Sequence, residues 1–179
     1  MLDAQSMVTA DKSMDVSAFG GYLYLNPDYG RSGSGVAAGA DLTRYFRWRV
    51  APSLEVRGNY ASAPAVSEST VLFGVRLKTD FRRRIHPYVD FLAGGGRIVF
   101  AQPPIPSYTQ DKSVVYSYGG GLDIDVHRNF AAKIDFQVQN WNMGPNSVIK
   151  GNQTADFTLA PTALVVGITY RIPFHPYVH

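Results

Sequence analysis

Ionisable side chains recur at every second position of two neighbouring segments in the second half of the chain. Residues 122–126 read LDIDV and residues 133–137 read KIDFQ. Acidic and basic groups so closely spaced could line a path for ions, or they could pair with one another. Alternation of period two is typical of a β-strand, which turns successive side chains to opposite faces. The chemistry of these groups therefore depends on which face of the strands is in water.

The same alternation recurs along most of the chain. Six more segments show it, at residues 15–25, 35–44, 50–60, 70–78, 87–100 and 161–172. With the two segments above they predict eight strands of roughly 9–12 residues and no helix, because no apolar pattern of helical period is sustained. The GGG sequence at 94–96 predicts a bulge or bend in the fifth strand.

One face of the predicted strands carries nearly all their charge, six acids and five bases. These residues are Asp41, Glu55, Arg57, Arg76, Lys78, Asp90, Asp123, Asp125, Lys133, Asp135 and Arg171. The opposite face is rich in Leu, Val, Ile and Phe. A soluble barrel or sandwich puts such charges in water, whereas a transmembrane barrel turns its apolar face to lipid and its polar face to the lumen.

Strand length and aromatic placement favour the membrane barrel. About 9–11 tilted residues span a bilayer, whereas strands of soluble proteins are usually shorter. Aromatic residues also gather near the predicted strand ends, as in the interfacial girdles of membrane barrels. The predicted girdle residues are Tyr45, Phe46, Trp48, Tyr60, Tyr88, Tyr118, Trp141, Tyr170 and Phe174. An even number of strands can also close, which leaves no unpaired edge in lipid.

The connections between the predicted strands alternate in kind. Links rich in Pro, Gly, Ser and Asn follow the odd strands, and short basic links follow the even ones. This asymmetry predicts an up-and-down meander with long loops at one end and tight turns at the other. The basic residues of the tight turns form a predicted rim: Arg44, Arg47, Arg49, Arg82, Arg83, Arg84 and Arg128. Such a rim could hold anionic lipid headgroups.

Several segments resemble a known superfamily, the eight-stranded outer-membrane β-barrels of the outer-membrane protein A and opacity type. The resemblance rests on SAFGGYLYLNP, GVAAGADLTRYF, IHPYVDFLAGGGRIVF, YSYGGGLDIDVHRNFAAKIDFQVQNW and the terminal VVGITYRIPF. It implies an all-β fold, an eight-stranded antiparallel up-and-down transmembrane β-barrel over residues 14–174. Residues 1–13 and 175–179 are expected to be tails. The resemblance further implies a Gram-negative outer membrane, reached by export with the signal peptide removed, and a periplasmic basic rim.

An eight-stranded barrel is just wide enough for side chains to fill its interior. Buried charges should then pair across the lumen, since an unpaired one would cost several kcal/mol. We expect one cluster of Glu55 and Arg57 with Asp41 and Arg76. We expect a second cluster of Asp123, Asp125, Lys133 and Asp135. The expected function is that of a structural or surface-interaction protein with a salt-bridged, closed lumen. The alternatives are a narrow pore for small solutes or ions and a soluble lipocalin-like carrier of an apolar ligand.

Other function classes lack support in the sequence. The absence of cysteine excludes disulfides and Cys-ligated metals. The basic run 82–84 is too short to indicate nucleic-acid binding. The histidines fall in predicted turns or the tail, and the His-x-Ser-Asn pattern of the lipid A deacylase barrels is missing. We therefore expect no enzymatic activity, no cofactor and no metal. The expected partners are outer-membrane lipid and a protein or surface ligand at loops 101–112 and 142–157.

Overall fold

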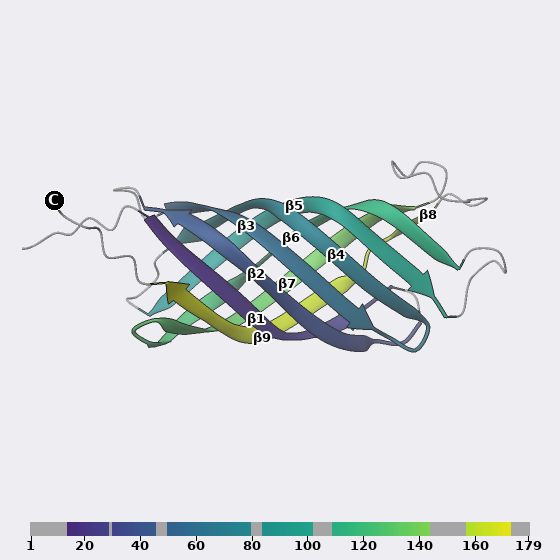
Figure 1. The fold of residues 1–179 in the computed structure, drawn as a ribbon, viewed down its shortest axis with the longest axis horizontal. Helices are drawn as coiled ribbons and strands as arrows, with labels where there is room; N and C mark the ends of the chain where they lie inside the picture. Colours follow the sequence, from purple (N-terminus) through teal and green to yellow (C-terminus); the bar gives the residue numbers. More distant parts are fainter. Residues whose placement is uncertain are drawn as a thin grey trace, which may run out of the picture.

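The fold is that of a barrel of long antiparallel strands (Figure 1). The computed structural model describes residues 14–28, 30–45, 50–79, 84–101, 109–143 and 157–172. In these ranges the strands are β1 (Met14–Asn26), β2 (Gly33–Arg44), β3 (Val50–Ser62), β4 (Val66–Thr79), β5 (Ile85–Phe100), β6 (Gln110–His127), β7 (Phe130–Met143), β8 (Phe157–Leu159) and β9 (Thr162–Ile172). The described part of the chain has no helix long and apolar enough to cross a membrane.

The sheet closes on itself as an eight-stranded up-and-down barrel. Each of β1 to β6 pairs with the next strand in sequence, and β1 also pairs with β9. The short β8 and the longer β9 both pair with β7, so together they form one interrupted eighth strand. At the interruption the backbone N–H of Gln139 donates to the Pro161 carbonyl at 2.9 Å, which keeps β7 paired. Closure is as the sequence predicts, and each of the eight long described strands has a neighbour on both sides.

The strands tilt, and the register shows by how much they are offset. Following the pairing partners once around from Asp15 leads to Thr43, Ser53, Arg76, Asp90, Gly119, Gln137, Ala163 and back to β1 at Leu25. The return point lies ten residues beyond the start. Such a stagger belongs to strands inclined by about 35–45° to the barrel axis. Residues far apart in sequence are thereby brought to one level of the interior.

Three local predictions are wrong. The strands reach 18 residues in β6, well beyond the predicted length. The expected long loop between β3 and β4 is a tight turn, in which the Ala63 and Val66 backbones bond to each other at 2.7 and 3.3 Å. Pairing runs unbroken through Gly94–Gly96, so GGG makes no bulge there. Within the described pairings of β6 and β7, the register shifts instead between Asp125 and His127.

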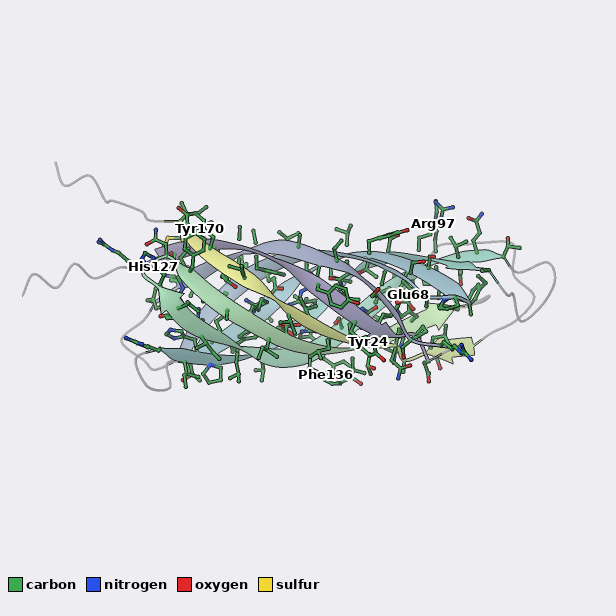
Figure 2. All side chains as sticks on the ribbon, turned by 90° about the horizontal axis from the view of Figure 1, so that it is seen from below. Tyr24, Glu68, Arg97, His127, Phe136 and Tyr170 are labelled. Carbon is green, nitrogen blue, oxygen red and sulfur yellow. The ribbon has the colours of Figure 1, made fainter. Side chains whose placement is uncertain are left out.

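The outer face of the barrel is apolar and the charged side chains point inward. Outward residues such as Val71 and Ile168 are 67% and 60% exposed, whereas Arg57 is 1% exposed. Figure 2 shows the arrangement, with Phe136 and Tyr24 on the outside near mid-barrel. A soluble carrier would need the reverse arrangement. The fold is therefore a transmembrane-type β-barrel, as the sequence predicts.

The two ends of the barrel differ. The connections after β1, β3, β5 and β7 lie at one end, called here the loop end, and those after β2, β4 and β6 lie at the other, the turn end. The described chain begins and stops at the turn end, since Met14 and Ile172 lie there (Figure 1). Figure 2 places Glu68 and Arg97 toward the loop end and His127 and Tyr170 toward the turn end.

Candidate functional site

The barrel interior holds a connected set of buried ion pairs, called here the charge network. Its members are Asp41, Glu55, Arg57, Arg76, Lys78, Asp90, Asp123, Lys133 and Asp135. They come from β2 to β7 because the alternating residues of each strand all turn the same way. All nine are buried.

Arg57 lies at the centre of this network. Its two terminal nitrogens donate to the two carboxylate oxygens of Asp135 at 2.7 and 2.9 Å. Its Nε donates to Glu55 at 2.8 Å, and its Nη2 lies 3.6 Å from Asp90. A guanidinium that meets a carboxylate with two parallel bonds is held in both distance and orientation. Arg57 thus ties β3 to β7 across the lumen.

Arg76 and Lys133 extend the network on either side. Arg76 pairs with Glu55, and lies 3.4 Å from Asp41. Lys133 lies 3.7 Å from Asp123, which Lys78 also approaches at 3.6 Å. Apart from Asp125, the two clusters expected from the sequence are therefore one, joined through Asp135, which contacts both Arg57 and Lys133. The described ion pairs of Asp125 are instead with Arg171 and His86.

Two aromatic rings fill the space between the cations. Phe19 from β1 lies under Arg57 and Lys133, at 5.3 and 4.7 Å from the ring centroid. The Tyr88 ring stacks under Arg76 at 4.0 Å, and its hydroxyl donates to Asp135 at 2.6 Å. Rings can stabilise cations through the negative charge of their faces. The aromatic rings thus add to the ion pairs and exclude water from the gaps.

The remaining predicted lumen charges lie nearer to the turn end. Asp125 accepts a hydrogen bond from Arg171 at 3.1 Å and lies 3.0 Å from His86. Its side chain is 24% exposed and that of Arg171 is 17% exposed. This pair therefore lies near the turn end of the interior, where it stays in reach of water.

Toward the loop end the interior is mainly apolar, which the sequence did not lead us to expect. One cluster, called here the apolar layer, contains Val66, Leu72, Leu92, Ile98, Phe100, Val115, Trp141, Met143 and Leu159. A second cluster of buried residues comes from β1, β2, β3 and β9 and contains Leu23, Leu25, Ala37, Ala61, Ala163 and Val165. A few polar groups lie among them, such as Gln139, which accepts from the Trp141 indole at 2.9 Å. The described interior thus contains two different layers. The layer nearer the turn end is charged, and the layer nearer the loop end is mainly apolar.

For two of the predicted girdle residues the prediction is wrong. Tyr88 and Trp141 point into the barrel, with exposed fractions of 4% and 0%. Their positions contain the signal: Tyr88 stands two residues from Asp90, and Trp141 two residues from Gln139, on the inward face of each strand. The alternation along each strand therefore predicts the inward direction of both rings, although aromatic residues near strand ends usually face the membrane interface.

The other predicted girdle and rim residues divide between described and undescribed parts of the chain. Tyr60, Tyr118 and Tyr170 are exposed on the outer face, and Tyr45 is half-buried beyond the end of β2. Arg44, Arg84 and Arg128 lie at the turn end. Outside the described residues lie Phe46, Trp48, Phe174, Arg47, Arg49, Arg82, Arg83, most of loops 101–112 and 142–157, and the tails 1–13 and 175–179.

The Trp141 indole packs directly against Gly96, in space that a larger side chain at position 96 would occupy. A Cβ at this position would come within 2.6 Å of the indole Cζ3 and 2.7 Å of the Val115 side chain. We expect Gly96→Ala to lower the free energy of unfolding by about 1–3 kcal/mol, since overpacking forces side chains off their rotamers. Urea titration of the refolded protein in detergent measures this.

The neighbouring Gly95 provides the control for that prediction. It faces outward, and a Cβ there meets nothing within 4 Å. Gly95→Ala should therefore leave stability nearly unchanged, and adding Trp141→Phe should relieve part of the Gly96→Ala loss. Equal effects of the two Gly→Ala changes would show that Gly96 is not packed against Trp141.

These buried ion pairs and apolar contacts pack the interior and stabilise the barrel. In the described ranges, no cluster of three or more His, Asp or Glu side chains is arranged to hold a metal ion. The interior pocket next to Leu23, Leu25 and Glu68 measures about 10 Å³. That is room for one water molecule.

Comparison with solved structures identifies the fold. Ail, the attachment invasion locus protein of Yersinia pestis, aligns with a TM-score of 0.53 at 12% identity, over 89% of this chain and 97% of that one. Neisserial surface protein A aligns with a TM-score of 0.51 at 13% identity, over 88% and 96%. A de novo designed transmembrane β-barrel aligns with a TM-score of 0.54 at 16% identity, over 88% and 95%. No family model and no curated protein matches the sequence.

These likenesses confirm the fold-level resemblance to the eight-stranded outer-membrane barrels. At 12–16% identity they do not extend to activity or partners.

Proposed function

We propose that this chain is a closed outer-membrane barrel that acts through its surfaces and not through its lumen. Its role is structural, or one of contact with a protein or surface ligand at the loop end. The observation that carries the proposal is the filling of the interior. Among the described residues, the buried side chains of the charge network and the apolar layer occupy successive levels of the interior, and this supports a closed lumen.

Ail and Neisserial surface protein A lend support to a surface role. The first is described as an attachment and invasion protein and the second as a surface protein. In this chain we place the contact with a protein or surface ligand at the loops 101–112 and 142–157.

The proposed orientation places the loop end outside the cell and the turn end in the periplasm. Arg44, Arg84 and Arg128 then belong to a basic periplasmic rim that attracts anionic lipid headgroups. The chain reaches this membrane by export, with a signal peptide removed. Addition of a membrane-impermeant protease to whole cells tests the orientation, because only loop-end segments should be cleaved.

An enzymatic role has no support from the described histidines. His86 pairs with Asp125 near the turn end of the interior. His127 is exposed, with its ring 6.5 Å from that of Phe130. Both contacts are accounted for by the structure of the turn end, so we propose that the barrel is not an enzyme.

Single-channel recording in a planar bilayer tests the closed lumen. We expect the refolded protein to insert without a steady current, because ions would have to cross both interior layers. A stable conductance would overturn the closed lumen and favour the narrow pore, with the charge network as its lining. Failure to insert, with solubility in plain buffer, would overturn the membrane placement itself.

A further inference from the structure

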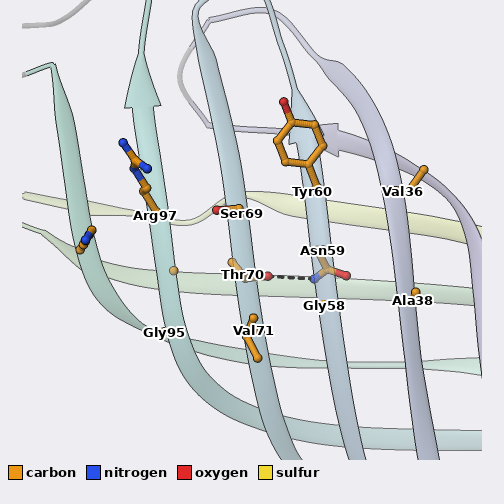
Figure 3. A pocket seen from close by; sticks show the side chains of 12 residues that line it. Val36, Ala38, Gly58, Asn59, Tyr60, Ser69, Thr70, Val71, Gly95 and Arg97 are labelled. Atoms are coloured by element: carbon orange, nitrogen blue, oxygen red, sulfur yellow. Dashed lines mark hydrogen bonds between the residues drawn. The ribbon is translucent and has the colours of Figure 1, made fainter.

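The outer face of the barrel carries a hollow of about 570 Å³, called here the outer hollow (Figure 3). It crosses β2 to β6 in the part of these strands nearest the loop end. Its lining is Val36, Ala38, Gly58, Asn59, Tyr60, Ser69, Thr70, Val71, Gly95, Gly96, Arg97 and Lys112. An outward hollow of this size is unexpected on a barrel whose neighbouring strands carry Val, Leu and Phe.

Missing side chains create the outer hollow. Gly95 and Gly58 face outward on β5 and β3, and a Cβ at Gly95 would meet no atom within 4 Å. At Gly58 the nearest atoms would be backbone oxygens at 3.9 Å. Tyr60 and Val71, both more than half exposed, stand beside these gaps (Figure 3). The floor is thus formed by backbone and the walls by apolar side chains.

The outer hollow also crosses a boundary in the chemistry of the outer surface. On β4 the outward residues are apolar from Leu77 back to Val71, and the next one toward the loop end is Ser69. On β5 the outward residue after Gly95 is Arg97. The hollow therefore begins in the apolar belt and ends among polar and basic groups, where lipid headgroups meet water.

Arg97 lies at this boundary and is exposed. Its described hydrogen bond is to the amide oxygen of Gln110, at 2.8 Å, a neutral group that orients the guanidinium without neutralising it. Lys112 lines the hollow from the neighbouring strand β6. A second hollow of about 290 Å³ continues toward the loop end and shares Tyr60, Ser69 and Arg97 with the first. Its lining includes Glu68, whose side chain is buried.

We propose that the outer hollow binds a membrane lipid whose phosphate headgroup carries a net negative charge. One acyl chain lies over Gly58 and Gly95, and the phosphate is held by Arg97 and Lys112. An acyl chain gains close contact from a groove that fits it, and Arg binds phosphate with two parallel hydrogen bonds. Charge complementarity favours this occupant over a second copy of the chain. The inference rests on the proposed membrane placement, and it adds a defined lipid site to it.

Native mass spectrometry of the full chain in detergent, titrated with dioleoyl phosphatidic acid, tests the site. Phosphatidylcholine with the same chains tests the charge requirement, and glycerol phosphate tests the need for a chain. We expect phosphatidic acid to bind about tenfold more tightly than phosphatidylcholine, and glycerol phosphate not to bind. Equal binding of the two lipids would overturn the proposal.

Paired variants locate the binding. Gly95→Leu fills the hollow and Arg97→Gln removes its charge, so each should weaken phosphatidic acid binding about tenfold. The control adds the same kind of bulk elsewhere: Ala132→Leu lies on the outer face of β7, across the ring from β3. Unchanged binding in the first two variants, or equal loss in all three, would overturn the site.

The remaining outcomes separate this proposal from the proposed function. A dimer that Gly95→Leu abolishes would show that a second copy occupies the hollow, and would overturn the lipid site. Folding is followed separately by the gel shift between boiled and unboiled samples. A folded barrel that inserts into bilayers but shows no lipid preference overturns the lipid site alone, whereas failure to insert overturns the membrane placement.

Discussion

Replacing Arg57 with methionine is expected to lower the free energy of unfolding by about 3–5 kcal/mol, because it leaves buried carboxylates without their partner. The guanidinium contacts Asp135 and Glu55 at 2.7–2.9 Å, and all three side chains are at most 1% exposed. Methionine keeps most of the volume, so the loss reports charge and not packing. Urea titration of the folded fraction in lipid or detergent measures it.

Two further variants show whether the loss comes from pairing. Arg84→Met removes a guanidinium from an exposed position at the turn end and should change stability by less than about 0.5 kcal/mol. Adding Asp135→Asn to Arg57→Met removes the charge that the first change leaves unpaired. The double variant should therefore lose less than the sum of the two single losses. Additive losses would show that Arg57 and Asp135 do not act as a pair.

The inward direction of the charges could be read from the sequence, but their partners could not. Alternation places Arg57 and Asp135 on the same face of their strands, and the structure buries both. They are 78 residues apart. Their contact depends on the register of every strand pair between them, a stagger that no local pattern encodes.

The second apolar cluster, which includes Leu23 and Leu25, was missed for a different reason. In β1 both faces look apolar, with Tyr22 and Tyr24 on one and Leu23 and Leu25 on the other. Hydropathy cannot decide between such faces, and the structure turns the leucines inward. The parity of Asp15 and Ser17, which are also buried, carries the missing information. One polar pair at a strand end thus fixes the direction of a whole strand.

The outer hollow could not be predicted at all from single segments. Gly58 and Gly95 are 37 positions apart, and each is unremarkable in a glycine-rich chain. They become one feature because β3, β4 and β5 pair in a register that sets Gly58 against Val71 and Val71 against Gly95. Absent side chains combine into a site only once neighbouring strands are aligned.

Replacing Trp141 with alanine is expected to cost about 3–5 kcal/mol of unfolding free energy, as for other large aromatic residues in cores. The indole is fully buried in the apolar layer, and its nitrogen donates to Gln139 at 2.9 Å. Tyr118→Ala, which truncates a half-exposed ring on the outer face, is the control and should lose less. Equal losses would show that the apolar layer adds little to stability.

The same variant also tests the idea of two seals. In Trp141→Ala alone, the charge network still fills the lumen toward the turn end. In Arg57→Met alone, the apolar layer still excludes water toward the loop end. Each single variant should therefore stay silent in planar bilayers, whereas the double variant should conduct, because neither layer is then complete. A steady current through Arg57→Met alone would show that the charge network is the sole barrier. Silence of a folded, inserted double variant would mean that the remaining side chains of both layers still close the barrel.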